Sequence, residues 1–312
     1  MQKQTSSSRS RHGRAQVAAI AVCLAATLPV TPVAAQTLDR IASTGRVAFG
    51  YRTDAAPFSH RDEAGKASGY AVTVCERIAA QLKTALGLGT LAIEWKPVTA
   101  ESALRSVQDG NVDLLCSPAS ATLKNRESVS FSIPIFPGGV GALTRVDAPP
   151  SLRRVLEERP RPYQPVWRGT VPPILEQRTF SVLGGSPASE WLTGRAAAFE
   201  APVKVAPVES FEEGIARVVE RKSDVLVGDR GELLEALFRS EHREDLAMLN
   251  RFYTYEPLAL ALPRGDENFR LLVDRALSRL YASPEFGEIF AGVFGEPQGD
   301  TVSFFRVTGV PE

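Results

Sequence analysis

The pattern of apolar and polar residues along the chain predicts strands and helices in alternation. Residues 46–51 alternate and are rich in β-forming side chains, and the segments 91–95 and 112–116 have the same character. Apolar residues recur at helical spacing from Tyr70 to Leu86, and a short helix is expected over residues 101–108. This β-α-β-α-β order predicts a mostly parallel sheet with helices on its faces.

A second α/β unit is predicted after a connection rich in proline and arginine, over residues 147–177. The expected strands are 180–183, 203–206, 224–227 and 257–263, and the expected helices are 188–199, 211–222, 231–238, 267–281 and 284–290. Two α/β units predict a cleft between them. In such folds a ligand binds at the carboxyl ends of strands, against helix N-termini.

Residues 1–35 have the composition of a secretory signal peptide. Four basic residues and no acidic one are followed by an apolar run from Ala15 to Val30 and by the small residues Val33-Ala34-Ala35. This order predicts cleavage before Gln36. The apolar run is shorter than the roughly 20 residues of a membrane-spanning helix and is broken by prolines. We therefore expect an exported protein.

Charge and cysteine content narrow the picture further. The chain has 36 Lys and Arg against 36 Asp and Glu, which is not the basic balance of a nucleic-acid-binding protein. Without the predicted signal peptide it keeps two cysteines, Cys75 and Cys116. In an oxidising compartment such a pair favours a disulfide, and the alternative is two buried free thiols.

Motifs for catalysis or metal binding are absent from the sequence. It contains no phosphate-binding loop of Walker type, no paired Cys or His at metal-ligand spacing and no Gly-x-Ser-x-Gly turn. We therefore expect no catalytic residue, no metal and no cofactor, and a protein that is not an enzyme.

Hydroxyl and charged side chains follow several predicted strands instead. Ser117, Ser120 and Thr122 come after the strand 112–116, and Asn125 and Arg126 follow them. The other candidates are Arg52 after the first strand, Ser186 at the start of a helix and Asp229 after the strand 224–227. Donors for a carboxylate together with one acid for an amine are what a zwitterionic solute needs. Helix capping and turns are the alternative role of the hydroxyls.

The chain resembles the periplasmic solute-binding proteins of polar amino-acid ABC transporters, the type 3 extracellular family, over roughly Leu38 to Gly295. The resemblance is carried by residues 46–52, 57–59, 65, 69–70, 110–117, 120–122, 131–132, 185–192, 229 and 269–277. It implies an α/β fold of two lobes that close on a ligand in a hinged interlobe cleft. Lobe one would comprise residues 36–143 and 254–312, and lobe two residues 144–253, with the crossings near 142–145 and 253–258.

The resemblance also implies roles for single residues. Ser117, Ser120 and Thr122 would line the lobe-one side of the cleft, Asp229 would take the amino group, and Phe58 and Ser186 complete the ligand-binding set. Arg52 is similar to an arginine that glutamate/aspartate binders use for the side-chain carboxylate. Asn125 stands where the family has its α-carboxylate arginine, with Arg126 one place later, and Pro187 stands where threonine is usual.

The function expected from the resemblance is the periplasmic binding of a small polar solute, an amino acid or related carboxylate, for delivery to an ABC-transporter permease. The protein is expected to act as a monomer without nucleic acid. A periplasmic dehydratase of cyclohexadienyl type is an alternative, and Glu190 or Asp229 would then be its general acid. A receptor that signals to a membrane partner is another.

Overall fold

The computed structural model describes residues 37–157, 173–175, 178–198, 203–297 and 299–312. The predicted signal peptide and most of the proline-rich connection lie outside the described residues. Within those ranges, no helix is both long enough and apolar enough to cross a bilayer.

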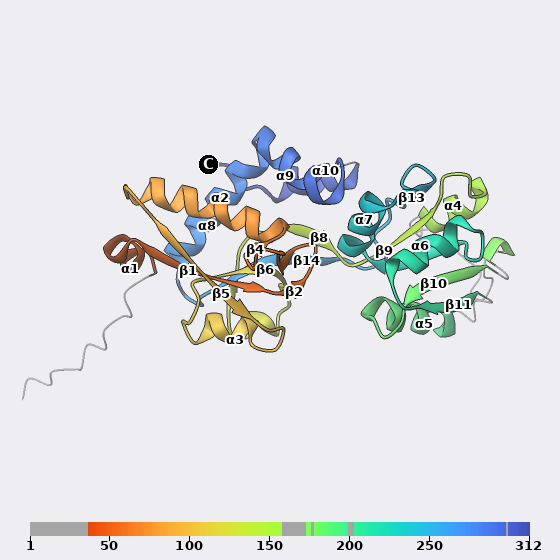
Figure 1. Ribbon diagram of the computed structural model, residues 1–312, viewed down its shortest axis with the longest axis horizontal. Coiled ribbons are helices and arrows are strands. Elements are labelled where there is room, and N and C mark those ends of the chain that lie inside the picture. The colour runs from red at the N-terminus through yellow and green to blue at the C-terminus, as the bar shows by residue number, and fades with distance from the viewer. Residues whose placement is uncertain (1–36, 158–172, 176–177, 199–202, 298) are drawn as a thin grey trace, which may run out of the picture. The chain divides into compact units, whose positions relative to one another are not determined.

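The first sheet has six strands and contains the N-terminal and C-terminal parts of the described chain (Figure 1). Its order is β5 (Ala92–Val98), β1 (Arg46–Arg52), β6 (Leu114–Ser120), β14 (Glu256–Leu262) and β7 (Ser130–Phe131), and β8 (Phe136–Gly138) also pairs with β14. Strand β1 is parallel to both β5 and β6, whereas β14 is antiparallel to β6. The parallel part agrees with the predicted β-α-β-α-β order.

Helices cover both faces of this sheet. The helices α2 (Tyr70–Ala85), α8 (Glu267–Tyr281) and α9 (Pro284–Phe294) lie on one face, and α3 (Ala103–Gln108) lies on the other. Val74, Ile78 and Leu82 of α2 recur at the helical period and are buried, because this spacing puts them on one side of the helix.

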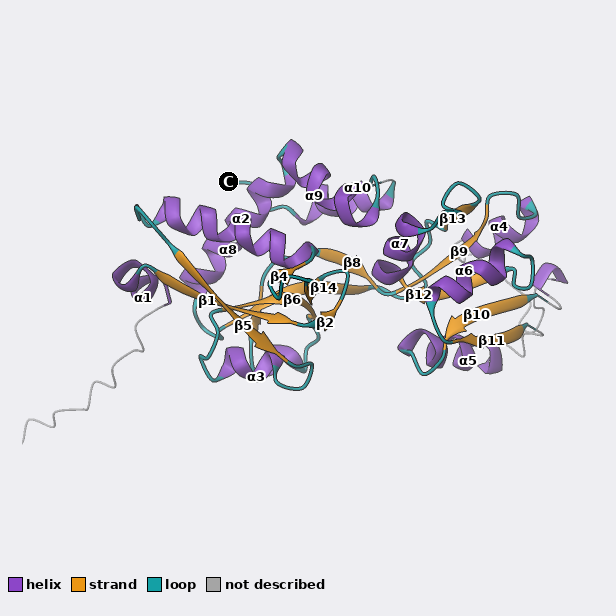
Figure 2. Ribbon diagram, viewed as in Figure 1, coloured by secondary structure: helices purple, strands orange, loops and turns teal. Residues whose placement is uncertain are grey.

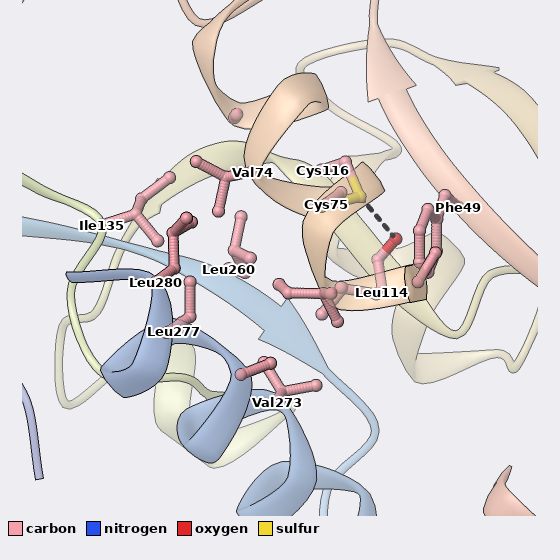
Figure 3. Packing of buried hydrophobic residues seen from close by; sticks show 14 of the residues in the cluster. Phe49, Val74, Cys75, Leu114, Cys116, Ile135, Leu260, Val273, Leu277 and Leu280 are labelled. Carbon is pink, nitrogen blue, oxygen red and sulfur yellow. Dashed lines mark hydrogen bonds between the residues drawn. A yellow bond between two sulfur atoms is a disulfide. The ribbon is translucent and has the colours of Figure 1, made fainter. Parts of the chain in front are cut away.

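Cys75 of α2 and Cys116 of β6 form a disulfide inside this core, so the predicted bridge is confirmed. Figure 3 shows the bridge beside Leu114 and Phe49, with side chains of α8 such as Val273 in the same cluster. Both cysteines are fully buried. The bridge ties the helix to the sheet that it covers.

The second sheet has five strands, which Figure 2 shows as a separate group. Its order is β11 (Lys204–Val208), β10 (Thr179–Leu183), β12 (Val225–Asp229), β9 (Val140–Arg145) and β13 (Leu246–Met248). Strand β10 is parallel to β11 and β12, and β9 is antiparallel to β12 and β13. Helices α4 (Pro150–Glu157) and α5 (Pro187–Ala198) pack on one face, and α6 (Phe211–Val219) and α7 (Arg230–Arg239) on the other.

Shorter elements complete the described chain. These are α1 (Thr37–Thr44), the small antiparallel sheet of β2 (Asp54–Ala55), β3 (Ser59–Arg61) and β4 (Ala67–Ser68), the 3-10 turns η1 (Asn125–Glu127) and η2 (Pro173–Leu175), and the C-terminal helix α10 (Asp300–Thr308).

The chain passes from one sheet to the other at two places that touch. The first crossing lies between β8 and β9 and the second between β13 and β14. Gly139 has a φ of 119°, and a Cβ there would lie 2.3 Å from the Thr254 carbonyl oxygen, so only glycine fits. The Val140 N–H also donates to Thr254 Oγ1 at 2.8 Å. The predicted lobe boundary after residue 143 falls inside β9, which pairs wholly within the second sheet; the division into lobes stays a prediction.

One difference from the predicted elements changes the position of a candidate site residue, and it concerns β6. We expected a strand over 112–116 with Ser117 beyond its end, but β6 runs from Leu114 to Ser120. The reason is β14, which pairs with Ala119 and Ser120 and so extends the strand. The ladder is irregular between the pairs formed by Leu115 and Ala119, a stretch that contains Pro118, which has no N–H to donate. A partner strand more than 130 residues away is not visible in the local pattern.

Candidate ligand-binding site

Arg52 lies at the carboxyl end of β1, beside the end of β5. Its guanidinium donates to both carboxylate oxygens of Asp54, from Nε to Oδ1 at 3.0 Å and from Nη2 to Oδ2 at 3.2 Å. Hydrogen bonding from Arg52 lowers the pKa of Asp54. The Ser59 hydroxyl donates to the Arg52 carbonyl at 2.9 Å, which holds the end of the strand in place.

Glu101 is the second acidic residue near Arg52. It follows β5, is exposed, and interacts electrostatically with both Arg52 and Asp54. Its pKa is lowered, first by its own backbone N–H and then by Thr99. The predicted carboxylate-binding arginine is therefore already paired with one acid and lies close to a second.

The residues after β6 hydrogen-bond mainly to one another. Asn125 Nδ2 donates to the Ser120 carbonyl at 2.9 Å, and the Asn125 N–H donates to Thr122 Oγ1 at 3.2 Å. Arg126 Nε donates to the Ala121 carbonyl at 3.3 Å, and its guanidinium lies 5.6 Å from the centre of the Phe131 ring. The turn closes on itself and uses some of the donors expected for a ligand carboxylate.

Ser117 differs from the other hydroxyls of this group. It lies within β6 instead of after it, is fully buried, and its Oγ has no hydrogen-bond partner in the described part of the chain. A buried hydroxyl without a partner is uncommon in folded proteins. Its role in binding stays a prediction.

Asp229 is the last residue of β12 and the N-cap of α7. Its Oδ1 accepts a hydrogen bond from the Gly231 N–H at 2.8 Å. Burial raises the pKa of Asp229, and hydrogen bonds from the backbone of Gly231, Glu232 and Gly139 oppose this rise. Among the described residues, none forms an ion pair with this carboxylate.

Glu232 lies in the first turn of α7, beside Asp229, and was not among the predicted residues. Its pKa is raised to about 7, first by burial and then by the neighbouring carboxylates of Asp229 and Glu235. The sequence carries a signal for it, since Asp229-Arg-Gly-Glu232 has the spacing of an N-cap followed by an acid three residues later. Asp229 and Glu232 together give this helix end two acids in partly buried positions.

Phe58 and Asp229 each lie beside Gly231. The Phe58 ring is buried and packs against Tyr70, Phe136 and Phe294. A Cβ at Gly231 would lie 2.5 Å from Phe58 Cζ and 3.3 Å from Asp229 Oδ1. The absence of a side chain at this position lets the ring lie against the start of α7.

Arg230 is the neighbouring cation, but it is engaged on another side. Its Nη1 donates to the Leu249 carbonyl at 3.1 Å, and its guanidinium lies 4.4 Å from the centre of the Phe252 ring. Burial lowers the pKa of Arg230 to about 10, while Asp300 and Asp229 oppose this change. Arg230 is attracted electrostatically to Asp229 but forms no ion pair with it.

Ser186 caps the helix α5. Its hydroxyl donates to the Leu183 carbonyl at 2.7 Å and accepts the Ser189 N–H at 3.2 Å. Pro187, the first residue of α5, has no N–H. Both findings leave this helix end with fewer free donors for an anion.

The predicted residues therefore form local groups. Arg52 pairs with Asp54, Asn125 joins Ser120 and Thr122, and Phe58 and Asp229 each lie beside Gly231. Within the described residues no hydrogen bond or ion pair links Arg52 or Thr122 to Asp229. The described residues also contain no cluster of His, Cys, Asp and Glu that could hold a metal ion.

Two of the cavities lie elsewhere. One of about 570 Å³ is lined by residues of α8 to α10 and the C-terminus, among them Tyr281 and Phe305. Another of about 350 Å³ is lined by residues that include Arg230, Phe238 and Phe290. None of the predicted ligand-binding residues lines either cavity.

Comparison with known proteins identifies the family. Residues 47–296 match the family described as bacterial extracellular solute-binding proteins, family 3. The L-glutamate/L-aspartate-binding protein of Pseudomonas aeruginosa is 22% identical over 283 residues, which cover 89% of this chain and 87% of that protein.

Solved structures share the fold. A polar amino acid ABC uptake transporter substrate binding protein from Streptococcus thermophilus aligns with a TM-score of 0.67 and 16% identity, over 86% of this chain and 93% of that one. An ancestral amino-acid-binding protein, described as a precursor of cyclohexadienyl dehydratase, aligns with a TM-score of 0.51 and 21% identity, over 83% and 100%. The predicted α/β fold of the periplasmic binding proteins is thereby confirmed. Since the family match spans most of its length, the chain belongs to the bacterial extracellular solute-binding proteins of family 3.

Proposed function

We propose that this protein binds a small polar solute with an ammonium group, an amino acid or a related compound, in the periplasm and delivers it to an ABC-transporter permease. The family match supports a binding protein outside the inner membrane. The names of its relatives, which include glutamate/aspartate-binding and amino-acid ABC-transporter-binding proteins, support the solute class and the transporter.

The carboxylate of Asp229 is the observation that carries this proposal. It lies at the carboxyl end of β12, where α/β folds bind their ligands, and it forms no ion pair with any of the described residues. Its burial makes an uncompensated negative charge unfavourable, as the raised pKa indicates. A ligand ammonium placed against this oxygen pair would supply the missing positive charge.

Two further acids strengthen the preference for a cation. Glu232 lies beside Asp229 at the start of α7, and Glu256 at the start of β14 is close enough to raise the pKa of Asp229. The electrostatic potential of these acids attracts an ammonium group and repels an anion. The solute would then stabilise the closed arrangement of the predicted lobes by contacting both.

The test is a binding screen with a matched pair of variants. Thermal-shift assays with the common amino acids and small amines are expected to raise the melting temperature for at least one of them, because a ligand that binds only the folded state stabilises it. Isothermal titration then gives its affinity. Asp229→Asn is expected to weaken binding about tenfold to a hundredfold, the usual loss for a hydrogen bond to a charged group.

Asp266→Asn is the control. Asp266 is also an N-cap, of α8, where its Oδ1 accepts the Phe269 N–H at 3.1 Å. Asparagine caps helices about as well as aspartate, so both variants should fold. If Asp229→Asn binds the solute as tightly as Asp266→Asn does, the ammonium is not held by Asp229 and the proposal fails.

A dehydratase of cyclohexadienyl type is the second candidate. Glu232 supports it, because a carboxyl with a pKa of about 7 can donate a proton at neutral pH. Glu190, one of the acids expected in that role, is exposed on α5. Product formation from prephenate or arogenate that is lost in Glu232→Gln would favour this enzyme over the receptor.

A further inference from the structure

We propose that Asp54 determines the specificity of this binding protein and directs it toward neutral or cationic amine-bearing solutes and away from dicarboxylates. The inference rests on the proposed function and specifies in addition which charge the preferred solute carries. It differs from what the name of the Pseudomonas aeruginosa relative says of that protein, which is glutamate and aspartate binding.

The guanidinium of Arg52 is occupied by Asp54. Two of its N–H groups point at the two carboxylate oxygens in a bidentate pair, the same geometry that a solute carboxylate would need. Asp54 follows Arg52 by only two residues, across a bend at Thr53, so the pair forms locally. The Ser59–Arg52 hydrogen bond holds the backbone in the position that allows it.

The charge around Arg52 also disfavours another anion. Glu101 interacts electrostatically with both members of the pair, so one positive charge lies among two negative ones. A solute carboxylate would have to displace Asp54 or remain close to two carboxylates. In both cases the solute carboxylate gains less electrostatic energy than it would from an arginine without an acidic partner.

Several other donors of the predicted ligand-binding set are partly used within the protein. The Asn125 amide is bonded to the Ser120 carbonyl, and Arg126 Nε to the Ala121 carbonyl. The Ser186 hydroxyl is used in capping α5. The contrast with Asp229, whose carboxylate forms no ion pair with a described residue, indicates a site whose charge suits a cation.

Asp54 can be changed without disturbing the fold. Its side chain is 62% exposed, and exposed ion pairs contribute little to stability. The matched control is Glu94→Gln, which removes an acid from another exposed arginine pair, one that joins β1 to β5. Arg46 and Glu94 form that pair at 2.8 Å, and Arg46 lies about 20 Å along β1 from Arg52.

The experiment measures the affinity of glutamine and glutamate, and of asparagine and aspartate, for the wild type, Asp54→Asn and Glu94→Gln by isothermal titration. Arginine is included as the cationic probe. We expect the wild type to bind an amide or arginine at least about tenfold more tightly than the dicarboxylates. Asp54→Asn should shift the amide-to-acid ratio about tenfold toward the acid, while Glu94→Gln leaves it unchanged.

Three results would overturn the inference. A wild type that binds glutamate or aspartate at least as tightly as its amide refutes it while leaving the proposed function intact. An equal change of the amide-to-acid ratio in Asp54→Asn and Glu94→Gln also refutes it and leaves the proposed function intact. Such a result would mean that the ratio depends only on the net charge of the protein and not on the position of Asp54. Failure of every probe and of the wider amine screen to bind any of the three proteins refutes the proposed function, and this inference with it.

Discussion

Removal of the Cys75–Cys116 disulfide offers a measurable test of how the first α/β unit is held together. The bridge joins α2 to β6 in the largest buried cluster, and both cysteines are fully buried. The double variant Cys75→Ala, Cys116→Ala removes the bond without burying a new polar group. Reduction of the wild type removes only the bond.

The expected loss of stability follows from the length of chain that the bridge closes. The two cysteines are 41 residues apart. In the chain-entropy treatment, a loop of this length restricts the unfolded state by about 4 kcal/mol at 25 °C. For a domain of 150 to 250 residues, 1 kcal/mol corresponds to roughly 2–4 °C, so the melting temperature is expected to fall by roughly 8–16 °C.

Differential scanning calorimetry provides the measurement. The oxidised wild type is compared with wild type that was unfolded in reductant and refolded in its presence, because a fully buried bond is poorly accessible in the native state. Native protein should show no free thiol. The reductant should leave the melting temperature of the double variant unchanged. A reduced wild type that melts within about 2 °C of the oxidised protein would show that the loop constraint does not stabilise this fold.

Three other predictions follow from the start of α7 and the turn after β6. Gly231→Ala would place a methyl against Phe58 and should weaken solute binding about tenfold by titration, whereas Gly292→Ala, where a Cβ meets no atom within 4 Å, should not. The pKa of Glu232 is raised in the folded state, so its contribution to stability is lost as the pH rises through about 7. Glu232→Gln should therefore melt at a higher temperature than wild type at pH 8 and at the same temperature at pH 4. Melting temperatures of the two proteins that differ by the same amount at both pH values would contradict this. Asn125→Arg should tighten binding of a solute with an α-carboxylate, and unchanged affinity would remove this position from the ligand site.

Much of the secondary structure is predictable from local pattern. The helix Glu267–Tyr281 has the bounds that its apolar spacing predicts, and α2 ends one residue earlier than predicted. These helices repeat apolar residues over several turns, and Asp266 accepts an N–H at the start of α8. Strong periodicity and a cap are local signals, which explains their accuracy.

Long-range pairing was less predictable. The sequence pattern ended a strand at Cys116, but pairing with β14 carries β6 on to Ser120. The family resemblance implied a crossing near Ala142–Arg145, and pairing with β12 and β13 places this segment in the second sheet as β9. Strands between partners distant in sequence depend on contacts that a local window does not contain.

For the candidate site, too, some features were predictable from the sequence and others were not. The position of Asp229 at a strand end was visible in the sequence, and so was the capping pattern that includes Glu232. The bidentate pairing of Arg52 with Asp54 and the approach of Phe58 to Gly231 were not. Their chemistry depends on which groups come within hydrogen-bond or van der Waals distance.

The sequence by itself determined the class of the fold, the order of its helices and strands, the family and the two cysteines able to form a bridge. These features follow from periodicity, residue type and order along the chain. Only the tertiary structure decided which charges are compensated. It pairs Arg52 with an acid and leaves Asp229 partly buried without an ion pair among the described residues. The physical reason is that the energy of a charge depends on its distance to other charges and on its burial, and both are set by packing between segments far apart in the chain.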